Sequence, residues 1–105
     1  MEREGSKVGS VDRRGWRVEG RVQGVGFRWF VRERARGLGV AGWVRNEADG
    51  SVRVQARGTP EALARLEEAV GVGPPSAEVR TVEEVPSLEG DDGEGFEIRL
   101  RGERR

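Results

Sequence analysis

Residues 16–38, WRVEGRVQGVGFRWFVRERARGL, contain the change of pattern that decides the fold. Apolar or small residues first alternate with charged ones, which is typical of a half-buried strand: Trp16, Val18, Gly20 and Val22. Gly24 and Gly26 then break the alternation. Apolar side chains next recur at helical spacing, at Phe27, Phe30, Val31, Ala35 and Leu38. The stretch therefore predicts a strand, a glycine turn and a helix that ends near Gly37.

The rest of the chain continues with strand and helix patterns. Asp49-Gly50 is a strong hairpin signal between two strand-like runs. Thr59 is suited to cap a second helix, because Pro60 and Glu61 follow it in the first turn. Within the next strand, a change of parity between Val79 and Val82 indicates a bulge. The further predicted strands cover residues 40–46, 51–58, 77–85 and 96–100.

The predicted order of elements is strand, helix, strand, strand, helix, strand, with one short strand more. This order predicts an α+β, ferredoxin-like split βαβ sandwich (βαββαβ). We expect an antiparallel sheet of four to five strands with two helices on one face. Residues 1–14 are predicted to form a flexible polar tail, and residues 15–102 a single domain. Because this fold serves enzymes, RNA binders and regulatory modules, the site has to decide the function.

The composition excludes several kinds of chemistry. The 105 residues include no Cys and no His, so disulfides, thiolate chemistry and histidine bases are ruled out. The aspartates at 49, 91 and 92 do not have the spacing of a calcium loop, and we expect no metal and no cofactor. No apolar run approaches the roughly 20 residues of a membrane helix, and the N-terminus lacks a signal-peptide core. We expect a cytoplasmic location.

Charge is unevenly distributed although the formal net charge is zero. Residues 11–58 carry 11 Arg against 5 acids, and residues 59–105 carry 6 Arg against 12 acids. Two interpretations stay open: the halves complement each other on folding, or the basic half attracts an anionic ligand. The scarcity of thermolabile side chains such as Asn and Met favours a thermostable protein, although a GC-rich genome also favours Arg and Gly. Asn46 is the one asparagine.

The glycine turn has the features of an anion site. Its backbone N–H groups can converge on one point, and the helix that follows adds its free N–H groups and positive dipole end. Arg28 lies in the first helical turn, where a cation is unfavourable unless an anion shares the site. An ordinary turn is the alternative, and the nucleotide P-loop and dinucleotide patterns are absent.

Two motifs now resemble those of the acylphosphatase family. Residues 22–28, Val-Gln-Gly-Val-Gly-Phe-Arg, match the family's phosphate-binding run, and residues 42–50 match its G-x-V-x-N-x-x-D-G block. The resemblance spans about residues 16–101 and includes the final strand, GFEIR, at residues 95–99. It implies that Arg28 binds the phosphate and Asn46 orients the attacking water. The implied phosphate cradle consists of Gln23, Gly24, Val25, Gly26, Phe27 and Arg28.

The resemblance implies hydrolysis of the carboxyl–phosphate bond of acyl phosphates. This chemistry suits the composition, since a carboxylate with a pKa of about 4 leaves without a general acid. The implied partners are a small acyl phosphate substrate and inorganic phosphate or sulfate, with no nucleic acid and no membrane, and we expect a monomer.

Two other functions remain as alternatives. An RNA-binding module needs aromatic side chains on a central strand, and residues 51–58 have none. A non-catalytic anion-binding or regulatory domain of the same fold is expected to lack Arg28 or Asn46, and both are present.

Overall fold

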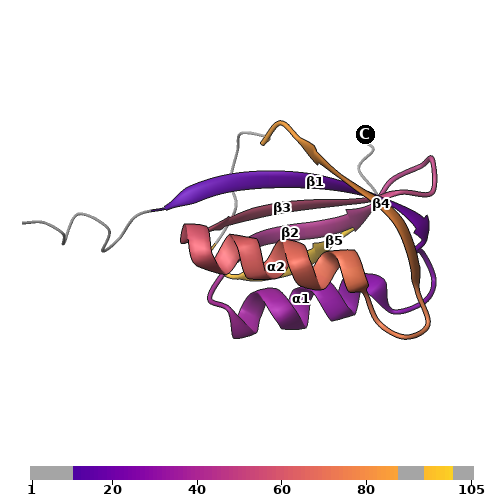
Figure 1. Ribbon diagram of the computed structural model, residues 1–105, viewed down its shortest axis with the longest axis horizontal. Coiled ribbons are helices and arrows are strands. Elements are labelled where there is room, and N and C mark those ends of the chain that lie inside the picture. The colour runs from indigo at the N-terminus through magenta and orange to yellow at the C-terminus, as the bar shows by residue number, and fades with distance from the viewer. Residues whose placement is uncertain (1–10, 88–93, 101–105) are drawn as a thin grey trace, which may run out of the picture.

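The computed structural model describes residues 11–87 and 94–100 (Figure 1). It confirms the predicted α+β fold and the predicted order of elements. The elements are β1 (Asp12–Arg21), α1 (Phe27–Gly37), β2 (Ala41–Asn46), β3 (Val52–Gly58), α2 (Pro60–Val72), β4 (Glu78–Val85) and β5 (Phe96–Arg99). The predicted acidic loop before Phe96 lies largely outside the described residues, because residues 88–93 are not among them.

The sheet has five strands in the order β4-β1-β3-β2-β5. Neighbours within β4-β1-β3-β2 are antiparallel, whereas β2 and β5 are parallel. The sheet is therefore mixed, and the prediction of a purely antiparallel sheet was wrong. β5 runs opposite to β4 but lies at the far edge, beside a strand of its own direction. Alternating apolar residues predict a strand without specifying its neighbour.

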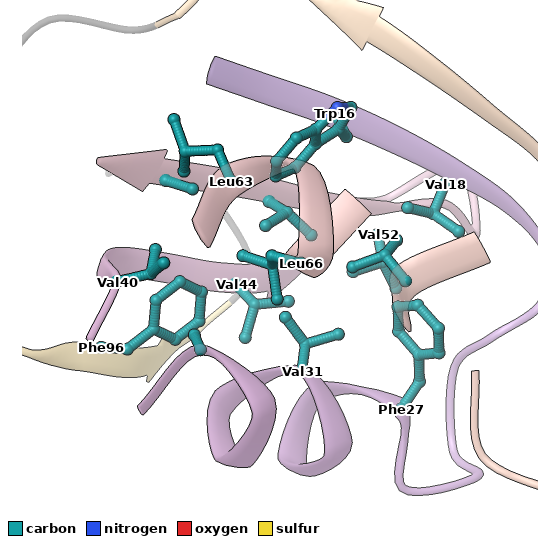
Figure 2. Close-up of a cluster of buried hydrophobic side chains, with 14 of the residues drawn as sticks. Trp16, Val18, Phe27, Val31, Val40, Val44, Val52, Leu63, Leu66 and Phe96 are labelled. Atoms are coloured by element: carbon teal, nitrogen blue, oxygen red, sulfur yellow. The ribbon is translucent and has the colours of Figure 1, made fainter. Parts of the chain in front are cut away.

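Both helices cover one face of the sheet (Figure 1). Alternate residues of the strands face the helices, and the apolar stripe of each helix covers them. The buried cluster in Figure 2 joins Trp16 and Val18 of β1 to Val52 of β3 and Phe96 of β5. The helices contribute Phe27, Val31, Ala35, Leu63, Leu66 and Val70 to this cluster.

Two local predictions are confirmed. The Thr59 hydroxyl accepts a hydrogen bond from Ala62 N at 3.1 Å, which is the predicted cap of α2. The bulge lies where the parity changes, because Glu19 pairs with Thr81 and Gly20 with Val79. Gly20 has a φ of 134°, and a Cβ there would overlap the Glu78 carbonyl. The bulge therefore needs a glycine on β1.

The ends of the strands differ from the predicted ends. β1 begins at Asp12, before the alternation that starts at Trp16, and residues 12–14 pair with β3. Residues 12–14 were predicted to belong to the N-terminal tail and instead belong to β1. Residues 1–10 lie outside the described residues, so the tail stays a prediction there. β5 ends at Arg99, and Leu100 is 86% exposed. Exposed charged residues at a strand end carry no periodic signal, which explains the missed start of β1.

The topology brings the two predicted motifs to one end of the sheet. β1 and β2 are both antiparallel to β3, so they run in the same direction and end on the same side (Figure 1). The glycine turn follows β1, and Asn46 is the last residue of β2. The N-terminus of α1 lies at this same end, because the glycine turn leads directly into it.

Candidate active site

The two glycines of the cradle have a backbone conformation that favours glycine. Gly24 and Gly26 have φ values of 74° and 78°, in the left-handed region. A Cβ at either position would have nothing within 4 Å. The conformation, rather than a lack of space, therefore explains both residues. Because both are also exposed, the turn lies open to a ligand from solvent.

The N-terminus of α1 has free amides. Gly26 is its N-cap, makes no side-chain cap, and no acid lies in the first turn. The first backbone bond of the helix runs from Phe30 N to Gly26 O, at 3.0 Å. Among the described residues, no backbone carbonyl accepts from the N–H groups of residues 24–28. At α2, by contrast, Thr59 caps the helix and Glu61 lies in the first turn. Of the two helices in the described part of the chain, α1 is therefore the one without a side-chain cap, and its N-terminal donors remain for another partner.

The side chains of the cradle divide into buried and half-buried ones. Phe27 is buried in the core, and Val25 packs against the core, so both side chains anchor the turn to the core. Arg28 is half-buried in the first turn of α1. Its side chain makes no hydrogen bond or ion pair with another described residue, whereas Arg17 bonds Asp49 at 2.6 Å. Arg28 therefore retains the fork of donors that binds two oxygens of an anion.

Asn46 has a buried acceptor without a donor. It pairs with Val52 at the end of β2 and shares the parity of Val44, which belongs to the buried cluster between sheet and helices. Its side-chain oxygen Oδ1 is buried and accepts no hydrogen bond within the described part of the chain. Such an atom costs about 1–3 kcal/mol of desolvation unless a water or ligand satisfies it.

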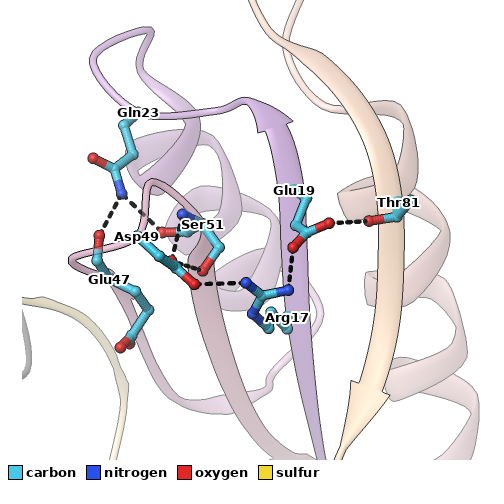
Figure 3. Close-up of polar contacts among 7 residues, drawn as sticks. All are labelled: Arg17, Glu19, Gln23, Glu47, Asp49, Ser51 and Thr81. Atoms are coloured by element: carbon cyan, nitrogen blue, oxygen red, sulfur yellow. Dashed lines mark hydrogen bonds and ion pairs between the residues drawn. The ribbon is translucent and has the colours of Figure 1, made fainter.

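Gln23 connects the cradle to the Asn46 hairpin (Figure 3). Its side-chain Nε2 donates to Glu47 O at 2.9 Å and to Ser51 O at 2.8 Å. A second tether holds the cradle from the other side, since Ser76 Oγ donates to Val25 O at 2.8 Å. The sequence identified Gln23 as a cradle residue without this role, and it did not identify Ser76. Both act on backbone carbonyls, which leave no mark in the sequence.

Asp49 holds the hairpin together from within. Its Oδ1 accepts from Ser51 N at 3.0 Å and from Ser51 Oγ at 2.6 Å, and its Oδ2 accepts from Arg17. The Ser51 hydrogen bonds, and then Arg17, lower the pKa of Asp49 well below its ordinary value. Arg17 also donates to Glu19, whose other oxygen accepts from Thr81 (Figure 3). The hairpin is thus fixed to β1 and, through it, to β4.

Other features of the described residues offer less chemistry. A cavity of about 760 Å³ lies between α1 and α2, with Phe30, Leu38 and Val72 in its lining and none of the predicted site residues. Within residues 11–87 and 94–100, no three His, Cys, Asp or Glu side chains gather as a metal site would require. No helix in this part of the chain has the length and apolarity to cross a membrane.

Comparison with known proteins identifies the family. The acylphosphatase family profile matches residues 15–98. A protein named acylphosphatase from Salinibacter ruber is 54% identical over 93 residues, which cover 89% of this chain and 98% of that protein.

Two solved structures share the fold. The acylphosphatase from Bacillus subtilis aligns with a TM-score of 0.73 and 42% identity, over 86% of this chain and 99% of that one. An acylphosphatase from Coxiella burnetii aligns with a TM-score of 0.77 and 35% identity, over 85% and 93% of the two chains. On the family profile and on these likenesses along most of its length, the chain belongs to the acylphosphatase family.

Proposed function

We propose that this member of the acylphosphatase family hydrolyses acyl phosphates without a metal ion, using Arg28 and the cradle amides to bind the phosphoryl group and Asn46 to orient water. The observation that carries the proposal is the uncapped start of α1. One turn of chain holds its first-turn amides, the left-handed glycines before them, and Arg28, which pairs with no other described residue. An anion is the ligand that satisfies all three.

The cradle matches the charge that develops in the reaction. In phosphoryl transfer, negative charge is spread over three oxygens of the transferring group. Fixed N–H donors and one guanidinium stabilise that charge without rearranging during the reaction. The planar fork of Arg28 can bind two of the oxygens at once, which a lysine cannot do.

Asn46 suits the attacking water. Its Oδ1 is buried and lacks a donor among the described residues, so a water can donate to it. The loose transition state does not require early deprotonation of that water. No strong base is therefore needed, in agreement with a chain that has no His and no Cys. The proton can pass to an oxygen of the substrate's own phosphate.

The leaving group explains why a general acid is dispensable. A carboxylate with a pKa of about 4 departs without protonation. The acyl part of the substrate is then free to vary, because the cradle contacts only the phosphate. We propose a small acyl phosphate as substrate, with inorganic phosphate as product and sulfate as its inhibitory analogue. The monomeric state, the heat resistance and the cytoplasmic location stay predictions from the sequence.

The test is benzoyl phosphate hydrolysis by the wild-type protein, with and without a chelator, beside Arg28→Ala and Asn46→Ala. We expect the chelator to change nothing. We expect Arg28→Ala to lose nearly all turnover, and the activity that remains should no longer be inhibited by phosphate. Asn46→Ala should lose on the order of 10²-fold in kcat, by analogy with the loss of one oxyanion donor. Its inhibition by phosphate should change little.

Three results would contradict the proposal. Full turnover in Asn46→Ala removes the water-orienting role, and full phosphate inhibition in Arg28→Ala removes the phosphate-binding role. A wild-type protein that binds phosphate but does not hydrolyse benzoyl phosphate is the non-catalytic anion-binding domain instead.

A further inference from the structure

We propose that Gln23 is a positioning residue, whose side-chain amide aligns the Asn46 hairpin with the phosphate cradle. Its side chain then acts on catalysis through Asn46 and not through the phosphate. The inference rests on the proposed roles of the cradle and Asn46, and it adds to them the means by which the two are aligned.

The strand ladder does not fix the cradle to Asn46. β1 and β2 are separated by β3, and the β1–β3 pairing ends at Val18 and Val52. Beyond Val18, β1 pairs only with β4, as far as Arg21. The last pair of β2 and β3 joins Asn46 to Val52. Chain from residue 19 to residue 23 therefore approaches the hairpin without a backbone ladder to hold it there.

The Gln23 side chain fills this gap in the ladder. Its amide nitrogen donates to Glu47 O and Ser51 O, at 2.9 and 2.8 Å. These two residues close the base of the hairpin, since Glu47 N also donates to Ser51 O at 2.8 Å. Gln23 directly precedes Gly24, and Glu47 directly follows Asn46. One side chain thus joins the first glycine of the cradle to the proposed water-orienting residue.

The chemistry of the contact fixes which end of the amide faces the hairpin. Both acceptors are carbonyl oxygens, and only an NH₂ group can donate to both at once. Figure 3 shows the nitrogen turned toward the hairpin and the oxygen turned away. Methionine has the length of glutamine but cannot donate, and an ionised glutamate would place an oxygen against two carbonyl oxygens.

The hairpin has a second support that is independent of Gln23. Asp49 accepts hydrogen bonds from Ser51 within the turn and from Arg17 of β1, and the Arg17 contact holds the turn to β1. Loss of the Gln23 contact should therefore leave the hairpin folded and shift Asn46 relative to the phosphate. A displacement of about 1 Å at a reacting group can cost on the order of 10²-fold in rate.

The experiment compares Gln23→Met with Gln55→Met, using benzoyl phosphate as substrate and inorganic phosphate as inhibitor. The Gln55 amide donates to Ser87 Oγ at 2.5 Å, away from the cradle, so the same chemical change serves as control. We expect Gln23→Met to lower kcat about ten- to hundredfold with little change in phosphate inhibition. Gln55→Met should keep both, and Gln23→Glu should be slower than Gln23→Met.

A double substitution separates positioning from direct contact. If Gln23 acts through Asn46, Gln23→Met should have no further effect on kcat in the Asn46→Ala background. Three results would overturn the inference. The effects of the two substitutions on kcat could multiply, phosphate inhibition could be lost in proportion to kcat, or both Gln23 variants could keep the wild-type kcat. Each of these results leaves Asn46→Ala impaired. Failure of the proposed function is a different result, in which Asn46→Ala itself keeps full turnover.

Discussion

Glycine at position 26 allows a positive φ without strain and also leaves the space beside the backbone empty, and a residue with a Cβ does neither. A φ of 78° strains any residue with a Cβ, by roughly 1–2 kcal/mol, yet the space around the missing Cβ is open. The residue therefore sets the direction of the chain into α1 and keeps that side of the turn free.

The two motifs and the glycine pattern allowed Gly24, Gly26, Arg28 and Asn46 to be named from the sequence. The hydrogen bonds of the Gln23 side chain could not be predicted, because the carbonyl groups that accept them lie 24 and 28 residues away in the sequence.

Replacement of Gly26 by alanine should affect both stability and phosphate binding. We expect Gly26→Ala to lower the free energy of unfolding by about 1 kcal/mol through left-handed strain, and to weaken phosphate inhibition, because a methyl group enters the open side of the turn. Urea denaturation and inhibition of benzoyl phosphate hydrolysis measure the two effects.

Gly37 provides the control for this substitution. A Cβ at Gly37 also has nothing within 4 Å, but its φ is not positive. Because Gly37 ends α1, Gly37→Ala should stabilise the helix by up to about 1 kcal/mol and leave phosphate inhibition unchanged. Equal effects of the two substitutions would show that the left-handed conformation of Gly26 plays no part.

At the scale of elements, the β2–β3 hairpin depends on a carboxylate. Asp49 accepts two hydrogen bonds from Ser51 and one from Arg17, and these lower its pKa well below the ordinary value of 3.8. The sequence predicted the hairpin from Asp49-Gly50, but the partner on β1 depends on strand register. The strand order places β5 beside β2, and apolar periodicity alone does not specify that order.

The pH dependence of stability tests this carboxylate. A carboxyl whose pKa is lowered by folding stabilises the protein above its unfolded pKa and loses that effect as the pH falls through the folded value. We expect Asp49→Asn to be less stable than the wild type by a constant amount above about pH 5, and by a shrinking amount below about pH 4. Urea denaturation above about pH 5 and below about pH 4 measures the difference in free energy of unfolding between Asp49→Asn and the wild type. A difference that does not vary with pH would exclude the carboxylate charge as its source.

At the scale of the whole molecule, the two interpretations of the uneven charge apply to different residues. Arg14 of the basic half bonds Glu67 at 3.0 Å and Glu84 at 2.7 Å, and both acids belong to the acidic half. Opposite charges therefore do complement each other where β1 meets α2 and β4. Exposed pairs of this kind contribute little stability. Arg28 has no such partner among the described residues, so its guanidinium is available to a ligand.

The fold as a whole brings the candidate site together from two separate motifs, residues 22–28 and residues 42–50. The order of elements and the helical face of the sheet could be predicted, since they follow from apolar periodicity. The meeting of the cradle and Asn46 follows from the parallel directions of β1 and β2, which the split βαβ order implies. The hydrogen bonds that align the cradle with Asn46 could not be predicted from the sequence. Each depends on where the folded backbone places its carbonyl groups.

The most direct test of the central claim is a titration with inorganic phosphate, followed through the backbone amide NMR signals. We expect the amides of residues 24–28 to shift with saturation in the wild type and to stay unchanged in Arg28→Ala. The Ala62 amide, already bonded to Thr59, is the internal control and should not shift in either protein. Unshifted signals for residues 24–28 in the wild type, or equal shifts in Arg28→Ala, would contradict a phosphate site built from those amides and that arginine.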